Sequence, residues 1–399
     1  MRVSVLTFGS IKTDWRVIKS AYMFDKLGHK VTLATFFEEG KPHECRINDR
    51  IVCTHLKFAE VVSRRNRFGI RRGRFNRRSF FDLLRASKFL KERLYKHDPP
   101  DLIYLHELDT LFCAVFLKFL YNDFKNTKFV YDAHELERAR WPLRTWIVRI
   151  TIRVSEFLSV KYLRASIVTV GAELANYLER SWPHYSRVRV IGNKPSQSPL
   201  NDYSRSRNFS ANPIPKFSNG LPTAVMSGNV TFNRGIEQIF EAMTYRCKFN
   251  LVLVGTVNDV QRSYFQKFIE SFGIEANVRF VGPRIYHQVS DYLSNFDFGI
   301  VGVVPQTKSY ELSCPNKLYE LYNTNLPAIV SDLPETRSWK KNMKLYEWLL
   351  CDMLDPSAIS ACVLEINNLI NSTQTITSRQ REPMYFNSDD DIDTYKCLL

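Results

Sequence analysis

The stretch from residue 297 to residue 335 limits the fold more than any other part of the chain. It reads DFGIVGVVPQTKSYELSCPNKLYELYNTNLPAIVSDLPE. The apolar run Phe298–Val304 predicts a buried strand, and after a polar loop Pro315 begins a short amphipathic helix. Ala328–Val330 then predicts a second strand. Strand, loop, helix and strand in this order form one α/β crossover, the unit from which parallel sheets are built.

Charged residues occupy the first turns of this predicted helix. Lys317 and Glu320 are three residues apart, so both side chains lie on one helix face. The helix N-terminus offers free amides and a positive dipole end to an anion. Amides and a cation suit a diphosphate, and a carboxylate suits the diol of a ribose. The crossover is therefore predicted to hold half of a nucleotide site.

The same alternation of strand and helix opens the chain. Residues 2–8 predict a strand that ends at Gly9-Ser10, Asp14 can cap a helix over 15–27, and 29–36 predict the next strand. This order begins a Rossmann-like unit, but no G-x-G-x-x-G follows the first strand, which argues against a dehydrogenase. Further strands are expected at 102–105, 129–131, 167–170 and 188–191, and helices at 80–96, 108–121, 142–164 and from 172.

A stretch rich in Ser, Asn and Pro separates this half from a second one. Residues 196–221 lack periodicity and predict a linker. Strands and helices then alternate again as far as residue 371. We therefore predict an α/β protein with two doubly wound Rossmann-like domains, 1–195 and 222–371, that face each other across a cleft. The tail 372–399 is expected to include a short helix that packs back on the first domain.

Composition indicates a globular chain without a membrane span. Hydrophobic residues make up 44% of the sequence and aromatic residues 13%. No run approaches the roughly 20 apolar residues that cross a bilayer, and the N-terminus does not resemble a signal peptide. The eight cysteines are scattered without a C-x-x-C pair. These features predict a reduced, cytoplasmic setting.

The net charge of +15 calls for an anionic partner, and much of it is local. Arg64–Arg78 contains eight arginines, which suits an anionic membrane surface, an anionic substrate, nucleic acid, or merely solvent. Helix 142–164 mixes Arg with Trp, Ile and Val, as an interfacial helix or a core-facing helix would. We predict a peripheral position on the inner face of the cytoplasmic membrane and no nucleic-acid partner. An anionic glycan acceptor explains the same charge.

Several motifs, in order along the chain, carry a family resemblance. YDAHE (131–135), VIGNKP (190–195), SGNVTFNRGIE (227–237) and PNKLYELYNTNLPAIVSD (315–332) resemble the GT-B glycosyltransferases of family 4, especially bacterial capsule, exopolysaccharide and lipopolysaccharide enzymes. DWRVIKSA (14–21) and GHKVTL (28–33) are also typical of that group. The resemblance implies a nucleotide-sugar donor in the second domain and a glycan or lipid-linked acceptor in the first.

The resemblance also implies roles for residues of the second domain. Glu320 matches the second glutamate of an E-x7-E motif, expected on the ribose. Leu312 stands where the first glutamate belongs, so either Glu311 or amides near Ser313–Asn316 take over the donor sugar. Arg234 matches the basic residue that neutralises the leaving diphosphate, while Asn229 replaces its arginine partner. The predicted donor-binding residues are Gly228, Asn229, Arg234, Glu311, Ser313, Pro315, Asn316, Lys317 and Glu320.

In the first domain, His134 matches the family's active-site histidine, which contacts the donor sugar. With Arg234 and Lys317 it forms the predicted catalytic set. A core histidine is the alternative for His134, a helix cap for Asp14 and Glu135, and a surface arginine for Arg16. The predicted acceptor-side residues are Gly9, Ser10, Asp14, Arg16, Asp132 and Glu135.

Neither a metal nor a cofactor is expected. His134, Glu135 and Glu137 have poor ligand spacing, Asp389–Asp391 lies in the tail, and no D-x-D follows a strand of the nucleotide half. The resemblance implies retention of configuration by a front-face route, with domain closure about 196–221 to exclude water. The alternatives are a GT-B sugar-nucleotide epimerase or phosphorylase, and a nucleic-acid-binding protein acting through the arginine-rich loop.

Overall fold

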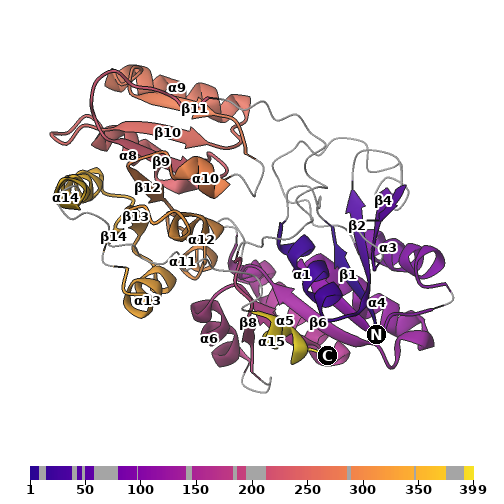
Figure 1. Cartoon of the computed structure of the whole chain (residues 1–399). Helices are drawn as coiled ribbons and strands as arrows, with labels where there is room; N and C mark the ends of the chain where they lie inside the picture. Colours follow the sequence, from indigo (N-terminus) through magenta and orange to yellow (C-terminus); the bar gives the residue numbers. More distant parts are fainter. Residues whose placement is uncertain are drawn as a thin grey trace. The chain divides into compact units, whose positions relative to one another are not determined.

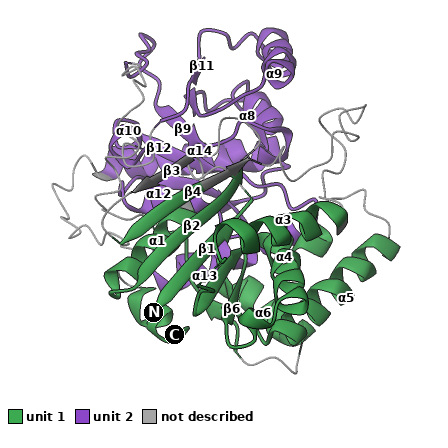
Figure 2. Ribbon diagram, turned by 90° about the vertical axis from the view of Figure 1, so that its right-hand side faces the viewer, with its two compact units in different colours: residues 1–203, 388–399 green, residues 204–387 purple. Residues whose placement is uncertain are grey.

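The computed structural model describes residues 1–8, 15–37, 43–46, 50–57, 80–96, 98–140, 146–182, 187–194, 213–284, 289–345, 347–373 and 391–399. The chain divides into two compact units (Figures 1 and 2). Unit 1 comprises Met1–Tyr203 together with Ser388–Leu399, and unit 2 comprises Ser204–Asn387. Among the described residues, no helix combines the length and the apolar composition that crossing a membrane requires.

Unit 1 is built on an eight-stranded sheet with the order β3-β4-β2-β1-β5-β6-β7-β8. Every pairing is parallel except that between β3 and β4. The central strand β5 is buried along its whole length, as expected for a parallel strand with both faces covered. The strands are β1 (Arg2–Thr7), β2 (Lys30–Phe37), β3 (His43–Arg46), β4 (Ile51–Lys57), β5 (Leu102–His106), β6 (Lys128–Ala133), β7 (Ser166–Thr169) and β8 (Arg189–Val190).

Amphipathic helices connect these strands. Helices α3, α4 and α5 lie side by side, with α4 in contact with both of its neighbours and with β5 and β6. Helix α1 packs on β1 and β2 and also touches the C-terminal helix α15. The helices of unit 1 are α1 (Trp15–Lys26), α3 (Phe80–Arg93), α4 (Glu107–Leu120), α5 (Trp146–Leu163), α6 (Ala172–Ser181) and α15 (Ile392–Lys396).

The C-terminal segment is part of the core of unit 1. Tyr395 is fully buried, and its ring lies 5.2 Å from that of Phe24 and 6.1 Å from that of Tyr104. The Asp391 carboxylate accepts a 2.6 Å hydrogen bond from Lys19 and forms a 3.0 Å ion pair with Lys194. Burial lowers the pKa of Lys19 to about 8, and Asp391 opposes this shift. Ring packing and ion pairs therefore fix α15 against α1 and the core of unit 1.

Unit 2 contains a second parallel sheet, with the order β11-β10-β9-β12-β13-β14. Its strands are β9 (Thr223–Ser227), β10 (Asn250–Val254), β11 (Val278–Val281), β12 (Phe298–Val301), β13 (Ala328–Ser331) and β14 (Trp348–Cys351). Its helices are α8 (Ile236–Ala242), α9 (Asp259–Phe272), α10 (Val289–Leu293), α11 (Lys308–Glu311), α12 (Asn316–Tyr322), α13 (Pro334–Asn342) and α14 (Pro356–Thr373).

Both sheets confirm the predicted α/β, doubly wound class. Strand order reverses between β1 and β5 in unit 1 and between β9 and β12 in unit 2. In open parallel sheets, ligands bind at such a switch point, outside the carboxyl ends of the strands. The sequence did not predict β3, β4, β14, α11 or α13, and the predicted strand 298–304 ends at Val301. Of the predicted linker, residues 196–212 lie outside the described part.

Candidate functional site

In unit 1, a buried ion pair lies at the carboxyl end of β6. Asp132 is fully buried and forms a bidentate ion pair with Arg16. Nε of Arg16 donates to Oδ2 at 2.8 Å, and Nη2 donates to Oδ1 at 2.5 Å. Arg16 also donates to the carbonyl of Ile191 and to Asn193. Burial would raise the pKa of Asp132, but Arg16 and His134 lower it well below the usual range. Arg16 is thus not a surface arginine.

Two histidines complete this cluster. His106 ends β5 and is paired in register with Asp132. Its Nδ1 lies 2.9 Å from Nε2 of His134, and these nitrogens are 3.4 and 3.5 Å from Oδ2 of Asp132. Burial, with smaller contributions from His134 and Arg16, lowers the pKa of His106 well below the usual range, against the effect of Asp132. A neutral His106 is therefore available to orient the ring of His134.

Sequence reasoning overlooked His106. A lone histidine after an apolar run carries no motif, and only strand pairing places it beside Asp132. The local backbone gives a second signal, because Glu107 adopts a positive φ of 70° at the start of α4. A non-glycine residue in this region costs on the order of 1–3 kcal/mol, and such strain clusters at functional sites.

His106, Asp132 and His134 could be considered as metal ligands, since one ligand atom from each lies within 4.8 Å of the others. However, the two histidine nitrogens already face each other at hydrogen-bond distance, and Asp132 is bound to a guanidinium. A cation would have to displace both interactions. The donor set therefore suits a hydrogen-bonded cluster better than a metal centre.

The neighbouring acidic residues form ion pairs. Arg140 contacts the carboxylates of Glu135 and Glu137, at 2.9 Å in each case. The side chain of Glu135 is 38% exposed, whereas Asp132 has no exposed surface. Glu135 is thus more accessible than Asp132, the other described carboxylate that was predicted on the acceptor side. Of the other predicted acceptor-side residues, Gly9, Ser10 and Asp14 lie outside the described residues.

In unit 2, the predicted donor residues meet where β9 ends. Glu320 of α12 is 2% exposed, and both of its oxygens are engaged. Oε1 accepts a hydrogen bond from Lys317 Nζ at 2.8 Å, and Oε2 accepts one from Ser227 Oγ at 2.9 Å. A cation and a carboxylate are thereby held together beside the turn that follows β9.

That turn depends on glycine. Gly228 has a φ of 111°, and a Cβ at this position would lie 2.6 Å from Cε of Lys317. Gly255, at the end of β10, has a φ of 152°, and a Cβ there would lie 1.7 Å from the carbonyl oxygen of Gly228. Close approach of these two turns therefore leaves no room for side chains, and Lys317 extends over the space above Gly228.

Other predicted donor residues surround this turn. Asn229 accepts a hydrogen bond from Thr256 at 2.6 Å. Arg234 ends a short 3-10 turn (Phe232–Arg234), and its carbonyl would be 2.0 Å from a Cβ at Gly302, directly after β12. The backbone of Arg234 is therefore held against the end of β12, within the same switch region of the sheet.

The loop before α12 departs from the family pattern, as the sequence indicated. Leu312 is buried, and Glu311 forms a 2.6 Å ion pair with Lys308 on α11 with 40% of its side chain exposed. Ser313 donates to the carbonyl of Tyr310, and Pro315 precedes α12 at the cap position. Asn316, the first residue of α12, is exposed. The structure brings Lys317 and Glu320 together with Ser227 but gives Glu311 a different partner.

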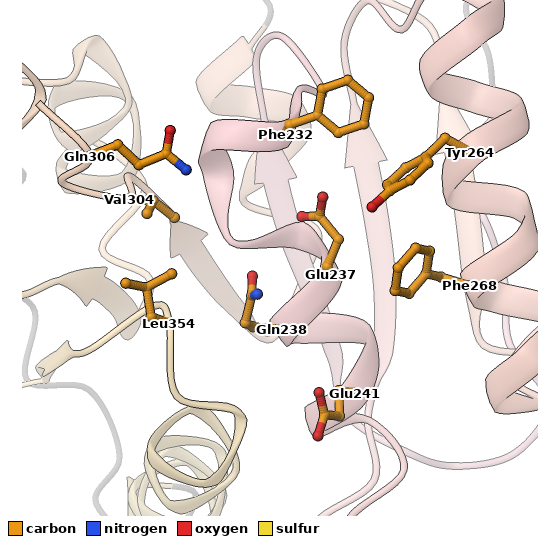
Figure 3. A pocket seen from close by; sticks show the side chains of 9 residues that line it. All are labelled: Phe232, Glu237, Gln238, Glu241, Tyr264, Phe268, Val304, Gln306 and Leu354. Atoms are coloured by element: carbon orange, nitrogen blue, oxygen red, sulfur yellow. The ribbon is translucent and has the colours of Figure 1, made fainter. Parts of the chain in front are cut away.

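A separate cavity of about 470 Å³ lies beside the 3-10 turn that carries Arg234 (Figure 3). Phe232, Tyr264 and Phe268 contribute rings, and Glu237 and Glu241 line the cavity from α8. Burial raises the pKa of Glu237. None of the predicted donor residues lines this cavity.

Solved structures with this fold cover nearly the whole chain. Sucrose-phosphate synthase from Thermosynechococcus elongatus has a TM-score of 0.74 at 15% identity, over 100% of this chain and 98% of that one. A glycosyltransferase from Rickettsia africae reaches 0.64 at 11% identity, with coverage of 100% and 98%. HepE from Anabaena, solved in complex with UDP and glucose, reaches 0.64 at 13% identity, with coverage of 99% and 98%. These likenesses establish the fold, which is that of the GT-B class.

Two family descriptions match the chain, one for each half. "Glycosyltransferase Family 4" matches residues 18–193, and "Glycosyl transferases group 1" matches residues 221–368. The search of curated proteins found no significant match. The protein is therefore a GT-B glycosyltransferase of the family 4 type, which confirms the resemblance that its motifs indicated.

Proposed function

We propose that this glycosyltransferase takes a sugar from a nucleotide-sugar donor bound by unit 2 and transfers it to a glycan or lipid-linked acceptor at unit 1, in the synthesis of a cell-surface polysaccharide. The observation that carries the proposal is the Lys317–Glu320–Ser227 constellation above Gly228. A cation suits the diphosphate, a fixed carboxylate suits the ribose diol, and a glycine turn lets phosphate approach the backbone.

Charge development explains what the cations contribute. As the glycosidic bond breaks, negative charge builds on the leaving diphosphate, and preorganised cations lower the barrier most when they face that charge. Lys317 and Arg234 are the residues proposed for this task. Because Glu320 holds Lys317 at 2.8 Å, the ammonium is positioned before the donor arrives. His134 is proposed to contact the transferred sugar, with its ring oriented by His106.

The proposal extends to the stereochemistry of transfer and to its metal requirement. Among the residues that the structure describes, no carboxylate is placed as a nucleophile for double displacement. We propose retention by a front-face route in which the leaving phosphate accepts the proton of the acceptor hydroxyl. Two protein cations on the diphosphate can replace a metal ion in charge neutralisation. Transfer is therefore proposed to proceed without a metal and to persist in EDTA.

Nucleotide binding tests the proposal. Thermal-shift and calorimetric titrations with UDP, GDP, ADP and CMP would identify the base, starting with UDP because HepE, a protein of the same fold, was solved with it. Lys317→Ala is expected to weaken diphosphate binding about tenfold or more, since it removes one direct charged contact worth roughly 1.5–3 kcal/mol. Lys267→Ala, at an exposed position of α9, serves as the matched control.

Product analysis separates transfer from the alternatives. A transferase releases the nucleoside diphosphate in proportion to acceptor glycosylation, whereas a sugar-nucleotide epimerase converts the donor without an acceptor. NMR of the new glycosidic bond would show the anomeric configuration. Equal binding of all nucleotides by wild type and Lys317→Ala would contradict the proposed donor site, and loss of transfer in EDTA that Mn²⁺ restores would contradict metal independence.

A further inference from the structure

Helix α5 of unit 1 has a buried inner face and an exposed outer face that carries a row of large apolar side chains. Its inner face contributes the buried residues Ile152, Glu156, Ser159, Val160 and Leu163. Its outer face carries large apolar side chains that are between 45% and 70% exposed: Trp146, Ile147, Ile150, Val154, Leu158 and Tyr162. A surface helix normally directs charged and polar residues outward, so this helix departs from the usual pattern.

The exposed side chains form one row. Trp146, Ile150, Val154, Leu158 and Tyr162 follow each other at intervals of four residues, which places them on successive turns of one side of the helix. In Figure 2, α5 lies outside α4, at the edge of unit 1. Single exposed apolar residues are ordinary, whereas a continuous row marks an interaction surface. We call this row the α5 strip.

Cations accompany the α5 strip. Arg149, Arg153, Lys161 and Arg164 are all exposed. At 100° per residue, Arg153 and Arg164 lie along the edge of the strip that begins at Trp146, next to the buried face. Long basic side chains at such an edge can extend to anionic headgroups while their methylene stems remain near the apolar row.

The ends of the strip also suit an interface between water and hydrocarbon. Trp146 begins α5 and Tyr162 stands next to its last residue, and both rings combine an apolar body with a polar atom. Near Tyr162, the amino group of Lys118 lies 5.8 Å from the tyrosine ring centroid. The two residues that follow Lys118, Phe119 and Leu120, are 72% and 45% exposed. Apolar surface thus continues at the end of α4.

We propose that the α5 strip inserts into the surface of an anionic lipid bilayer, with α5 parallel to the membrane plane and its cations at the headgroups. This binding mode goes beyond attraction of the arginine-rich segment to lipid charge, because it buries apolar side chains. A second copy of the chain is the competing occupant. A two-fold dimer would bring the same cations of both copies together, and this like-charge repulsion disfavours it.

Vesicle flotation of the full chain tests the proposal. Vesicles of phosphatidylcholine with 30% phosphatidylglycerol are expected to carry the protein upward, and pure phosphatidylcholine vesicles to carry less of it. Ile150→Glu with Leu158→Glu is expected to reduce partitioning at least tenfold, since it places two carboxylates within the strip. Both side chains are at least half exposed, so the fold should survive, and circular dichroism checks this.

The matched control places the same charges on unit 2. Val260 of α9 and Leu364 of α14 are 77% and 52% exposed, and Val260→Glu with Leu364→Glu should float like wild type. Both double variants retain Arg64–Arg78. Equal flotation of wild type and the Ile150/Leu158 variant would therefore assign docking to other cations and overturn the proposal.

Two further results would also overturn it. One is failure of the wild type to float with anionic vesicles. The other is a dimer in lipid-free sedimentation that the Ile150/Leu158 variant dissociates, together with absent vesicle binding. Flotation uses no donor or acceptor, so the proposal stands or fails independently of the proposed donor site.

Discussion

The pair formed by Arg16 and Asp132 carries the clearest energetic consequence at the scale of single residues. Both side chains are at least 94% buried, and the contact is bidentate. Breaking a buried pair leaves an uncompensated charge and costs about 3–5 kcal/mol, whereas an exposed pair contributes about 1 kcal/mol or less. Arg337 and Asp332 form a bidentate pair of the exposed kind, with Arg337 60% exposed.

We therefore expect Arg16→Met to destabilise unit 1 by about 3–5 kcal/mol, and Arg337→Met to change the stability of unit 2 by less than about 1 kcal/mol. Urea denaturation of the two variants at pH 7 measures this difference. Similar small effects of both substitutions would show that the Arg16 contact adds no more than a surface pair.

His106 predicts how stability depends on pH. Its pKa is depressed in the folded state by burial, so the unfolded chain takes up a proton as the pH falls through about 6.5 while the folded chain does not. Stability contributed by neutral His106 is thus present above pH 6.5 and lost below it. Between pH 7 and pH 5 this loss amounts to about 2 kcal/mol.

His106→Gln should remove this titration. The urea-denaturation stability of the variant is expected to fall less between pH 7 and pH 5 than that of wild type. Because glutamine can still donate a hydrogen bond toward His134, the folded unit should survive at pH 7. An unchanged pH slope would show that the pKa of His106 is the same in the folded and unfolded chain, and would contradict the depressed pKa of the folded state.

At the scale of elements, α15 is the segment whose removal should matter most for its size. Tyr395 is fully buried between Phe24 and Tyr104, and Tyr104 donates a 3.0 Å hydrogen bond to Asp132. Tyr395→Ala is expected to cost about 3–5 kcal/mol, as for other large aromatic side chains in a core. Lys396→Ala, at an exposed position of the same helix, is the control. Thermal unfolding of both variants tests this; equal melting temperatures would contradict the packing role.

Elements with strong periodicity could be predicted from the sequence, and elements shaped by tertiary contacts could not. The continuous apolar run of β5 and the helical spacing of apolar residues in α1 indicated their structures directly. In contrast, β14 has only four residues and follows a charged segment, and α13 is mostly polar. Their structures depend on neighbours that a local pattern does not contain.

The candidate sites show the same division. Lys317 and Glu320 could be predicted because helical spacing puts them on one face, and the structure shows their contact. The link from Glu320 to Ser227 spans 93 positions of sequence, and that from Arg16 to Asp132 spans 116, so spacing could not indicate either. His106 became visible only through strand register.

At the scale of the whole molecule, the two units differ in how their chains are organised. Unit 2 is one continuous segment, Ser204–Asn387, whereas unit 1 combines segments from both ends of the chain. We expect the isolated segment 204–387 to fold and to bind the same nucleoside diphosphate as the full chain, with affinity within about tenfold. Calorimetry on both proteins checks this. Complete loss of binding by a folded segment would mean that unit 1 contributes essential donor contacts.

The discontinuity of unit 1 also orders events during synthesis. Residues 388–399, which place Tyr395 in the core of unit 1, are translated only after all of unit 2. At typical rates of about 5–20 residues per second, this delay is roughly 10–40 s. Throughout it, the aromatic surface that Tyr395 will cover stays open on the nascent chain. Maturation of the first domain is therefore timed by completion of the second, and a ribosome that stalls within unit 2 leaves an unfinished first domain exposed to chaperones and proteases.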